Sequence, residues 1–138
     1  NLTNIAQFSF KQALSITGLV LPPNLTTIGA YAFQDDKALT GNLALPKSLK
    51  SLGASAFTGC QLTSLVIPDE RLTSIASEAF KNNAFSGSLV LPSQISTVGG
   101  SAFANDTKKP GIGFTNVGVQ GGYESRWVED LRNNAIAN

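Results

Sequence analysis

The 138-residue sequence contains no histidine, and this absence limits the chemistry open to the chain. Its many Ser and Thr residues lack the usual general base of nucleophilic catalysis, and the nearby Lys residues form no catalytic motif. Cys60 is the single cysteine, so the chain can form no internal disulfide and no cysteine-based metal site. The commonest zinc ligand is missing as well. We therefore expect no enzyme, no metal and no cofactor.

Charge is also scarce, because only 14% of the residues are charged and the formal net charge is +1. The basic residues are scattered, and Lys108-Lys109 is the only adjacent basic pair. This pattern offers no electrostatic footprint for nucleic acid. No apolar run approaches the roughly 20 residues that cross a bilayer, so no membrane insertion of this segment is expected. Hydrophobic residues make up 42% of the chain, which is enough for a folded core.

The remaining reactive or polar groups fit structural roles better than chemical ones. The acidic residues of Asp35-Asp36 and Asp69-Glu70 do not repeat in phase with one another, and we interpret them as solvated turn residues, not as catalytic or calcium-binding groups. Asn82-Asn83 is likewise typical of a turn. Cys60 is expected to be a buried thiol of the core.

What the sequence does contain is an internal repeat marked by three recurring motifs. The first is an aliphatic residue followed by proline, the second an aliphatic residue followed by Gly or Ala, and the third a small residue followed by Phe. Successive phenylalanines of the third motif are 23, 24, 23 and 23 positions apart. The motifs occur at Leu21-Pro22, Leu45-Pro46, Ile67-Pro68 and Leu91-Pro92; at Ile5-Ala6, Ile28-Gly29, Leu52-Gly53, Ile75-Ala76 and Val98-Gly99; and at Ser9-Phe10, Ala32-Phe33, Ala56-Phe57, Ala79-Phe80 and Ala102-Phe103.

Each repeat predicts one short strand and a compact return segment. The run from Leu62 to Ile67 alternates apolar and small residues, as a half-buried strand does, and Pro68 ends it by withholding an N–H. The return is too short and too β-branched for a helix, so we expect a tight extended or 3₁₀-like path on the convex side. Glycines at 29, 53, 99 and 100 suit sharp turns with positive φ.

A repeat of about 23 residues cannot bury its own apolar side chains, so neighbouring repeats should stack around one continuous core. The strands then align in parallel, and two columns of aliphatic residues point inward. The phenylalanine column fills the opposite side of the core. The predicted columns are Leu19/Leu43/Leu65/Leu89, Leu21/Leu45/Ile67/Leu91 and Phe33/Phe57/Phe80/Phe103.

The motif L-x-x-L-x-L/I-P followed by L-x-x-I-G/A-x-x-A-F closely resembles the BspA-like, or Treponema pallidum-type, leucine-rich repeat over roughly residues 2–104. The resemblance implies a leucine-rich-repeat solenoid with a parallel concave sheet. It also implies surface proteins of host-associated bacteria and parasitic protists that serve in adhesion and protein binding. Gly41 and Gly87 depart from the pattern, since each lies in a strand lead-in that is one residue longer. We expect these insertions to bulge a loop without breaking the stack.

The two ends of the repeat array differ. We divide the chain into residues 1–104, the regular repeats, and residues 105–138, a degenerate last repeat with a strand at Phe114–Val119 and a C-terminal helical cap. The cap is predicted because Trp127, Val128 and Leu131 share one helix face. At the N-terminus the sequence starts in mid-repeat, which favours a fragment of a longer array; the alternative is that another segment or an oligomer contact supplies the missing half.

A repeat array of this kind binds through the outward residues of its concave strands. The outward column within the L-x-L/I-P motif is Val20, Ala44, Val66 and Val90, flanked by the small polar residues Asn42, Ser64 and Ser88. An exposed apolar column can mark a partner site, or it can reflect only the β-propensity of valine. We predict a secreted or cell-surface segment that binds a protein, such as host extracellular matrix or a surface glycoprotein, through this column. The alternative is a structural stalk or targeting array attached to another, possibly enzymatic, domain.

Overall fold

The computed structural model describes residues 1–104 and 113–119, and within these ranges the chain forms strands and turns but no helix. All paired strands run parallel. The elements are β1 (Asn4–Ile5), β2 (Thr27–Ile28), β3 (Thr40–Ala44), β4 (Ser51–Leu52), β5 (Gln61–Val66), β6 (Ser74–Ile75), β7 (Ser86–Leu91), β8 (Thr97–Val98) and β9 (Gly113–Val119).

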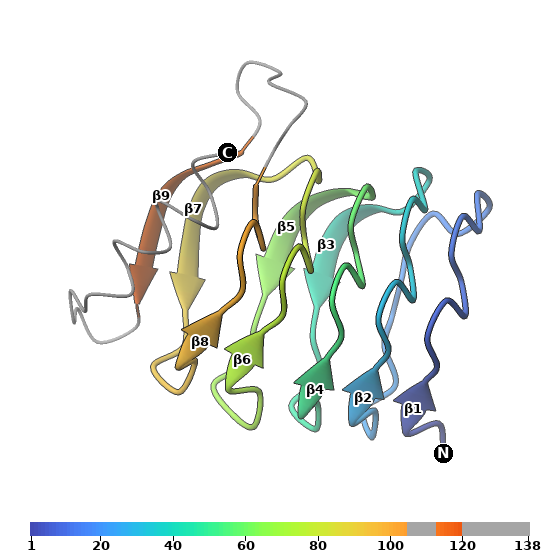
Figure 1. The fold of residues 1–138 in the computed structure, drawn as a ribbon, viewed down its shortest axis with the longest axis horizontal. Helices are drawn as coiled ribbons and strands as arrows, with labels where there is room; N and C mark the ends of the chain where they lie inside the picture. The colour runs from blue at the N-terminus through green and yellow to red at the C-terminus, as the bar shows by residue number, and fades with distance from the viewer. Residues whose placement is uncertain (105–112, 120–138) are drawn as a thin grey trace.

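The strands form two rows, one of long strands (β3, β5, β7 and β9) and one of two-residue strands (β1, β2, β4, β6 and β8) (Figure 1). The long strands pair as β3–β5 and β7–β9, and the short ones as β1–β2–β4 and β6–β8. Strand pairing thus joins equivalent segments of successive repeats. The predicted parallel strands are confirmed, and the return segment holds a second, shorter strand that the sequence analysis did not expect.

The turn segment that follows each short strand is tied to the next repeat by backbone hydrogen bonds. In the third repeat, Ser55 N donates to Ser77 O at 3.0 Å and Phe57 N donates to Ala79 O at 2.8 Å. Ser55 has a φ of 56°, and equivalent residues of the other repeats also have positive φ. Positive φ at intervals is incompatible with a 3₁₀ helix, so the 3₁₀ part of our expectation is wrong; the return is a run of consecutive turns.

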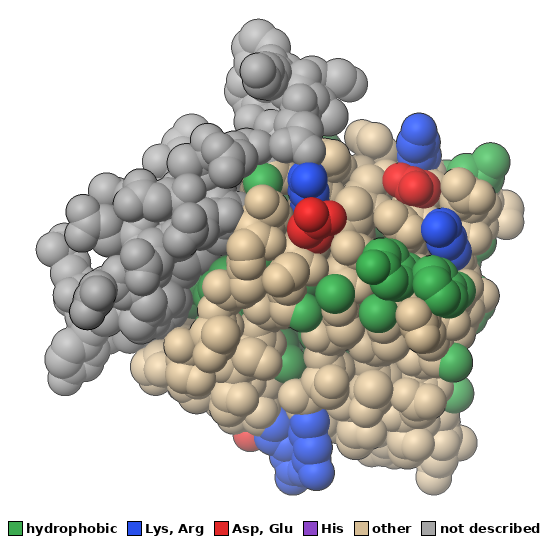
Figure 2. Space-filling model, viewed as in Figure 1, with side chains coloured by type: hydrophobic (Ala, Val, Ile, Leu, Met, Phe, Trp, Pro, Cys, Tyr) green, Lys and Arg blue, Asp and Glu red, His purple; other side chains and the backbone are tan. Residues whose placement is uncertain are grey.

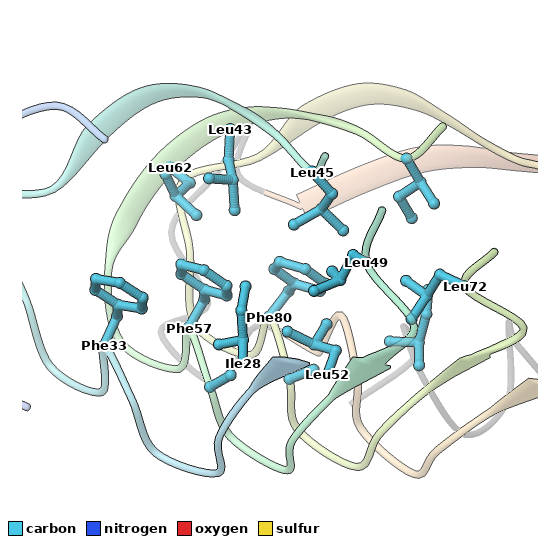
Figure 3. Close-up of a cluster of buried hydrophobic side chains, with 14 of the residues drawn as sticks. Ile28, Phe33, Leu43, Leu45, Leu49, Leu52, Phe57, Leu62, Leu72 and Phe80 are labelled. Atoms are coloured by element: carbon cyan, nitrogen blue, oxygen red, sulfur yellow. The ribbon is translucent and has the colours of Figure 1, made fainter. Parts of the chain in front are cut away.

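The core lies between the two rows of strands and is built on a column of stacked phenylalanine rings (Figure 3). The centroids of Phe33 and Phe57 are 5.0 Å apart with planes 5° apart, and those of Phe57 and Phe80 are 5.6 Å apart with planes 3° apart. Phe103 continues the column. The predicted inward columns are confirmed, although Leu19 and Leu65 are only half-buried.

The glycines of the second motif are required for a different reason than the one predicted from the sequence. None of Gly29, Gly53 or Gly99 has a positive φ. A Cβ at Gly53 would lie 2.3 Å from the backbone nitrogen of Ala30 in the preceding repeat, and Gly29 and Gly99 are equally crowded. Glycine therefore stands here because neighbouring backbones approach closely, and the expectation of positive-φ turns is wrong at these positions.

At the strand lead-in containing Gly41 the stack of repeats continues as predicted, but the extra residue in the pairing is Thr63 of the partner strand β5. Gly41 has a φ of 84°, and the pairing of β3 with β5 shifts register between Gly41 and Asn42 before it continues to Ala44. The same shift occurs between Gly87 and Ser88 in β7. The longer lead-ins thus change the local register and leave the stack of repeats intact.

At the two ends the outcome is mixed. Strand β9 pairs with β7 and confirms the predicted last strand. The second repeat forms no long strand at residues 17–21, so the expectation of one strand in every repeat is wrong there. The predicted helical cap at Trp127–Leu131 lies outside the described residues.

Candidate binding face on the long strands

The residues predicted to form the binding column are exposed on the row of long strands, here called the long-strand face (β3, β5, β7 and β9). The relative exposure of Val20 is 96%, that of Val66 is 52% and that of Val90 is 61%. Ala44 is exposed too and lies directly opposite Val66 in the β3–β5 register. Val20 has the same place in its motif but precedes the first long strand.

Alternation along the strands explains this exposure. Leu43 and Leu45 are buried on either side of the exposed Ala44, and Leu89 and Leu91 flank the exposed Val90 in the same way. Because successive side chains of a strand point to opposite faces, burial of the leucines forces the central residue outward. The apolar column is therefore a consequence of the core that lies beneath it.

Two of the small polar residues beside the column are joined by a hydrogen bond. Asn42 lies opposite Ser64 across β3 and β5, and Ser64 Oγ donates to Asn42 Oδ1 at 2.8 Å. Ser88 takes the equivalent place in β7, opposite Asn116 of β9; its side chain is outside the described set. The four long strands contain no Asp, Glu, Lys or Arg, so this face carries no charge of its own.

A second exposed apolar group lies on the turn segments of the first two repeats. The rings of Phe8 and Tyr31 are stacked with centroids 5.1 Å apart, and Phe8 is 49% exposed. Lys11 Nζ lies 5.5 Å from the centre of the Phe8 ring. Figure 2 shows that hydrophobic side chains gather toward the N-terminal end on the face it presents. This aromatic pair was not predicted as a site.

The comparison with protein families decides which kind of repeat this is. The family described as "BspA type Leucine rich repeat region" matches residues 3–117 in six copies. The chain belongs to this family. The resemblance inferred from the motifs is thereby confirmed, and the leucine-rich repeat accounts for the parallel strands and the spacing of the core leucines.

Two solved structures resemble this BspA-type chain. The leucine-rich repeat protein of T. pallidum is 23% identical with a TM-score of 0.61, and the match covers 79% of this chain and 50% of that one. A leucine-rich cell surface protein of Faecalibacterium prausnitzii A2-165 is 16% identical with a TM-score of 0.48, over 83% and 43% of the two chains. Our chain thus spans about half the length of these proteins. A search of curated proteins found no match.

Three buried side chains with polar groups occupy equivalent places in the BspA-type repeats, and two of them were wrongly predicted from the sequence. Asp36 and Asn83 were predicted to be solvated turn residues, yet they are 0% and 6% exposed. Cys60 is 0% exposed, as expected, and burial raises the pKa of its thiol to about 12. All three residues come three positions after a stacked phenylalanine, and this shared spacing could have identified them as one set.

The BspA-type repeats offer little material for chemistry in the part of the chain that is described. No group of three potential metal ligands occurs among those residues. Nor do they form a helix long and apolar enough to cross a membrane. Leucine-rich repeats are generally non-enzymatic scaffolds for protein interactions, and the long-strand face is the candidate site that fits this use.

Proposed function

We propose that the chain is a protein-binding segment of a secreted or cell-surface BspA-type protein, and that it binds its partner through the long-strand face. The observation that carries the proposal is the column of exposed valines on strands without charge. Isolated exposed valines are ordinary on a protein surface, but here Val66 lies directly opposite the exposed Ala44 across β3 and β5, and β7, which carries Val90, is in contact with β5. The stacked repeats extend this surface as a solenoid does, with the strand side concave.

The face favours a partner of a particular character. Strands β3, β5 and β7 offer neither charge for steering nor an aromatic platform for stacking on sugars, so a flat, weakly charged protein surface fits this part of the face better than a polyanion or a glycan. Host extracellular-matrix proteins or surface glycoproteins are the partners we propose. The surface location is proposed on the same ground, since adhesion requires exposure outside the cell.

The test is a paired substitution on the face with a control on the opposite side. Val66→Glu with Val90→Glu places two charges in the column, and both positions are exposed, so the fold should be retained. We expect binding to purified extracellular-matrix proteins, measured by biolayer interferometry, to weaken by about 30-fold or more, since losing a central contact costs about 2 kcal/mol.

Phe8→Glu is the matched control, because Glu78 already occupies the equivalent position of its repeat with a φ of 58°. This variant should bind as the parent does. If the valine variant binds undiminished, the long-strand face is not the contact surface. If no tested matrix protein binds the parent, the stalk or targeting role gains support over adhesion.

A further inference from the structure

The three buried polar residues lie at one repeated place in the fold, here called the ladder position, three residues after each core phenylalanine. Its occupants in the described repeats are Ala13, Asp36, Cys60 and Asn83. Successive repeats stack directly on one another, and the side chains of Asp36, Cys60 and Asn83 each form a hydrogen bond with the backbone of the preceding repeat. The side chain at this position therefore determines which hydrogen-bond partner the buried backbone groups of the preceding repeat have.

Two of the occupants donate a hydrogen bond to the same kind of acceptor. Asn83 Nδ2 donates to Phe57 O in the preceding repeat at 2.8 Å and to Phe80 O in its own repeat at 3.0 Å. Cys60 Sγ donates to Phe33 O in the preceding repeat at 3.1 Å. The ladder position thus calls for a donor directed at the carbonyl of the preceding phenylalanine.

Asp36 in its ordinary charged form has no hydrogen to donate at this position. Its Oδ1 accepts a hydrogen bond from Ala13 N, so Oδ2 is the oxygen that could carry a proton and donate it. Oδ2 is buried, and no donor of the described residues reaches it. By its place in the repeat, Asp36 corresponds to Cys60 and Asn83, whose acceptors are the phenylalanine carbonyls of the preceding repeats. An ionised carboxylate has two acceptor oxygens and no proton, so it could not donate to the corresponding carbonyl of Phe10.

We propose that Asp36 is protonated in the folded chain and donates its Oδ2 hydrogen to the carbonyl of Phe10, so that the first repeat docks on the second more firmly in acid than at neutral pH. The carboxylic acid then acts as the amide of Asn83 does. The ladder becomes a pH-sensitive joint at one boundary between repeats, while the joint made by Asn83 is insensitive to pH.

The charged surroundings favour the neutral acid. Burial is the main cause that raises the pKa of Asp36 above 3.8, and the neighbouring Asp35 raises it further against the lowering effect of the Ala13 amide. The following repeat contributes only the Cys60 thiol among titratable groups from 55 to 62. In the preceding repeat the one charged residue is Lys11, whose ammonium lies over the Phe8 ring, and Lys37 of the same repeat is exposed.

The sign of the effect follows from proton linkage. A carboxyl whose folded pKa is raised binds its proton more tightly in the folded state than in the unfolded state. Its stabilising effect is complete below pH 3.8, the unfolded value, and declines as the pH rises through the folded pKa. This is opposite to the usual behaviour of a salt-bridged carboxylate.

The decisive variant is Asp36→Asn in the full chain, which supplies a permanent donor. Thermal unfolding followed by circular dichroism should give a Tm above that of the parent by about 4 °C at pH 7, and the same Tm at pH 3. A Tm at pH 7 that is unchanged or lower than that of the parent would overturn the proposal. Taking the difference between the two proteins cancels the titration of the other acidic residues.

Two further measurements keep the proposal testable on independent grounds. A ¹³C NMR titration of the Asp36 carboxyl should show a midpoint above 3.8; a midpoint at or below that value contradicts it. Asn83→Asp should create a second pH-dependent joint, with a lower Tm than the parent at pH 7 that recovers toward pH 3. A loss of Tm that is the same at both pH values would show that an acid at the ladder position does not act as a donor.

Discussion

The stacked phenylalanine column should make the centre of the array far more sensitive to truncation than its first repeat. Phe57 is fully buried between Phe33 and Phe80, whereas Phe10 is 40% exposed and stacks on Phe33 alone. Truncating a buried phenylalanine to alanine costs about 3–5 kcal/mol, and each ring pair adds about 0.5–1.5 kcal/mol. We expect Phe57→Ala to lower the free energy of unfolding by about 5 kcal/mol and Phe10→Ala by about 2 kcal/mol.

Urea denaturation at 25 °C, followed by circular dichroism and by hydrogen exchange, measures both losses. Two probes are needed because stacked repeats can unfold one after another, and a single free energy is defined only when the probes coincide. Phe57→Leu, which keeps most of the volume but loses the ring contacts, serves as a milder variant with an expected loss of about 1–2 kcal/mol. Equal losses for Phe57→Ala and Phe10→Ala would refute the idea that the central rings stabilise the stack.

Two other predictions concern the close approach of the backbones and the buried thiol. Gly53→Ala should lower the Tm by several degrees, because the new Cβ would meet the backbone of the preceding repeat at 2.3 Å; Gly100→Ala, where no atom lies within 4 Å, should leave it nearly unchanged. The Cys60 thiol, whose pKa rises from 9.0 to about 12, should react with a disulfide reagent at pH 8 about a thousandfold more slowly in the folded chain than after unfolding in urea. Rapid labelling of the native protein would contradict its burial.

Much of the fold could be predicted from the sequence because the three motifs recur at a nearly constant spacing. The phase of the three motifs placed Leu43, Leu45 and the phenylalanine column in the core, and the structure buries all of them. The exposure of Val66 and Val90 followed from strand alternation alone. That these residues bind a partner stays a prediction, since exposure is only a precondition for binding.

The errors arose where one residue type has two possible physical roles. Glycine permits both positive φ and close packing, and only the position of Ala30 against Gly53 shows which one applies. Asn83 and Asp36 have the composition of turn residues, but the approach of the preceding repeat encloses them. The backbone carbonyls that they face are not visible in a single repeat, because they belong to the neighbour.

The central claim is that the long-strand face contacts the partner, and methyl-labelled NMR tests it most directly. A matrix protein that binds the chain would be titrated into a sample with labelled valine methyl groups. The account predicts that the signals of Val20, Val66 and Val90 broaden or shift first, while that of the half-buried Val98 stays unchanged. Binding that leaves the signals of Val66 and Val90 unaffected would contradict the account.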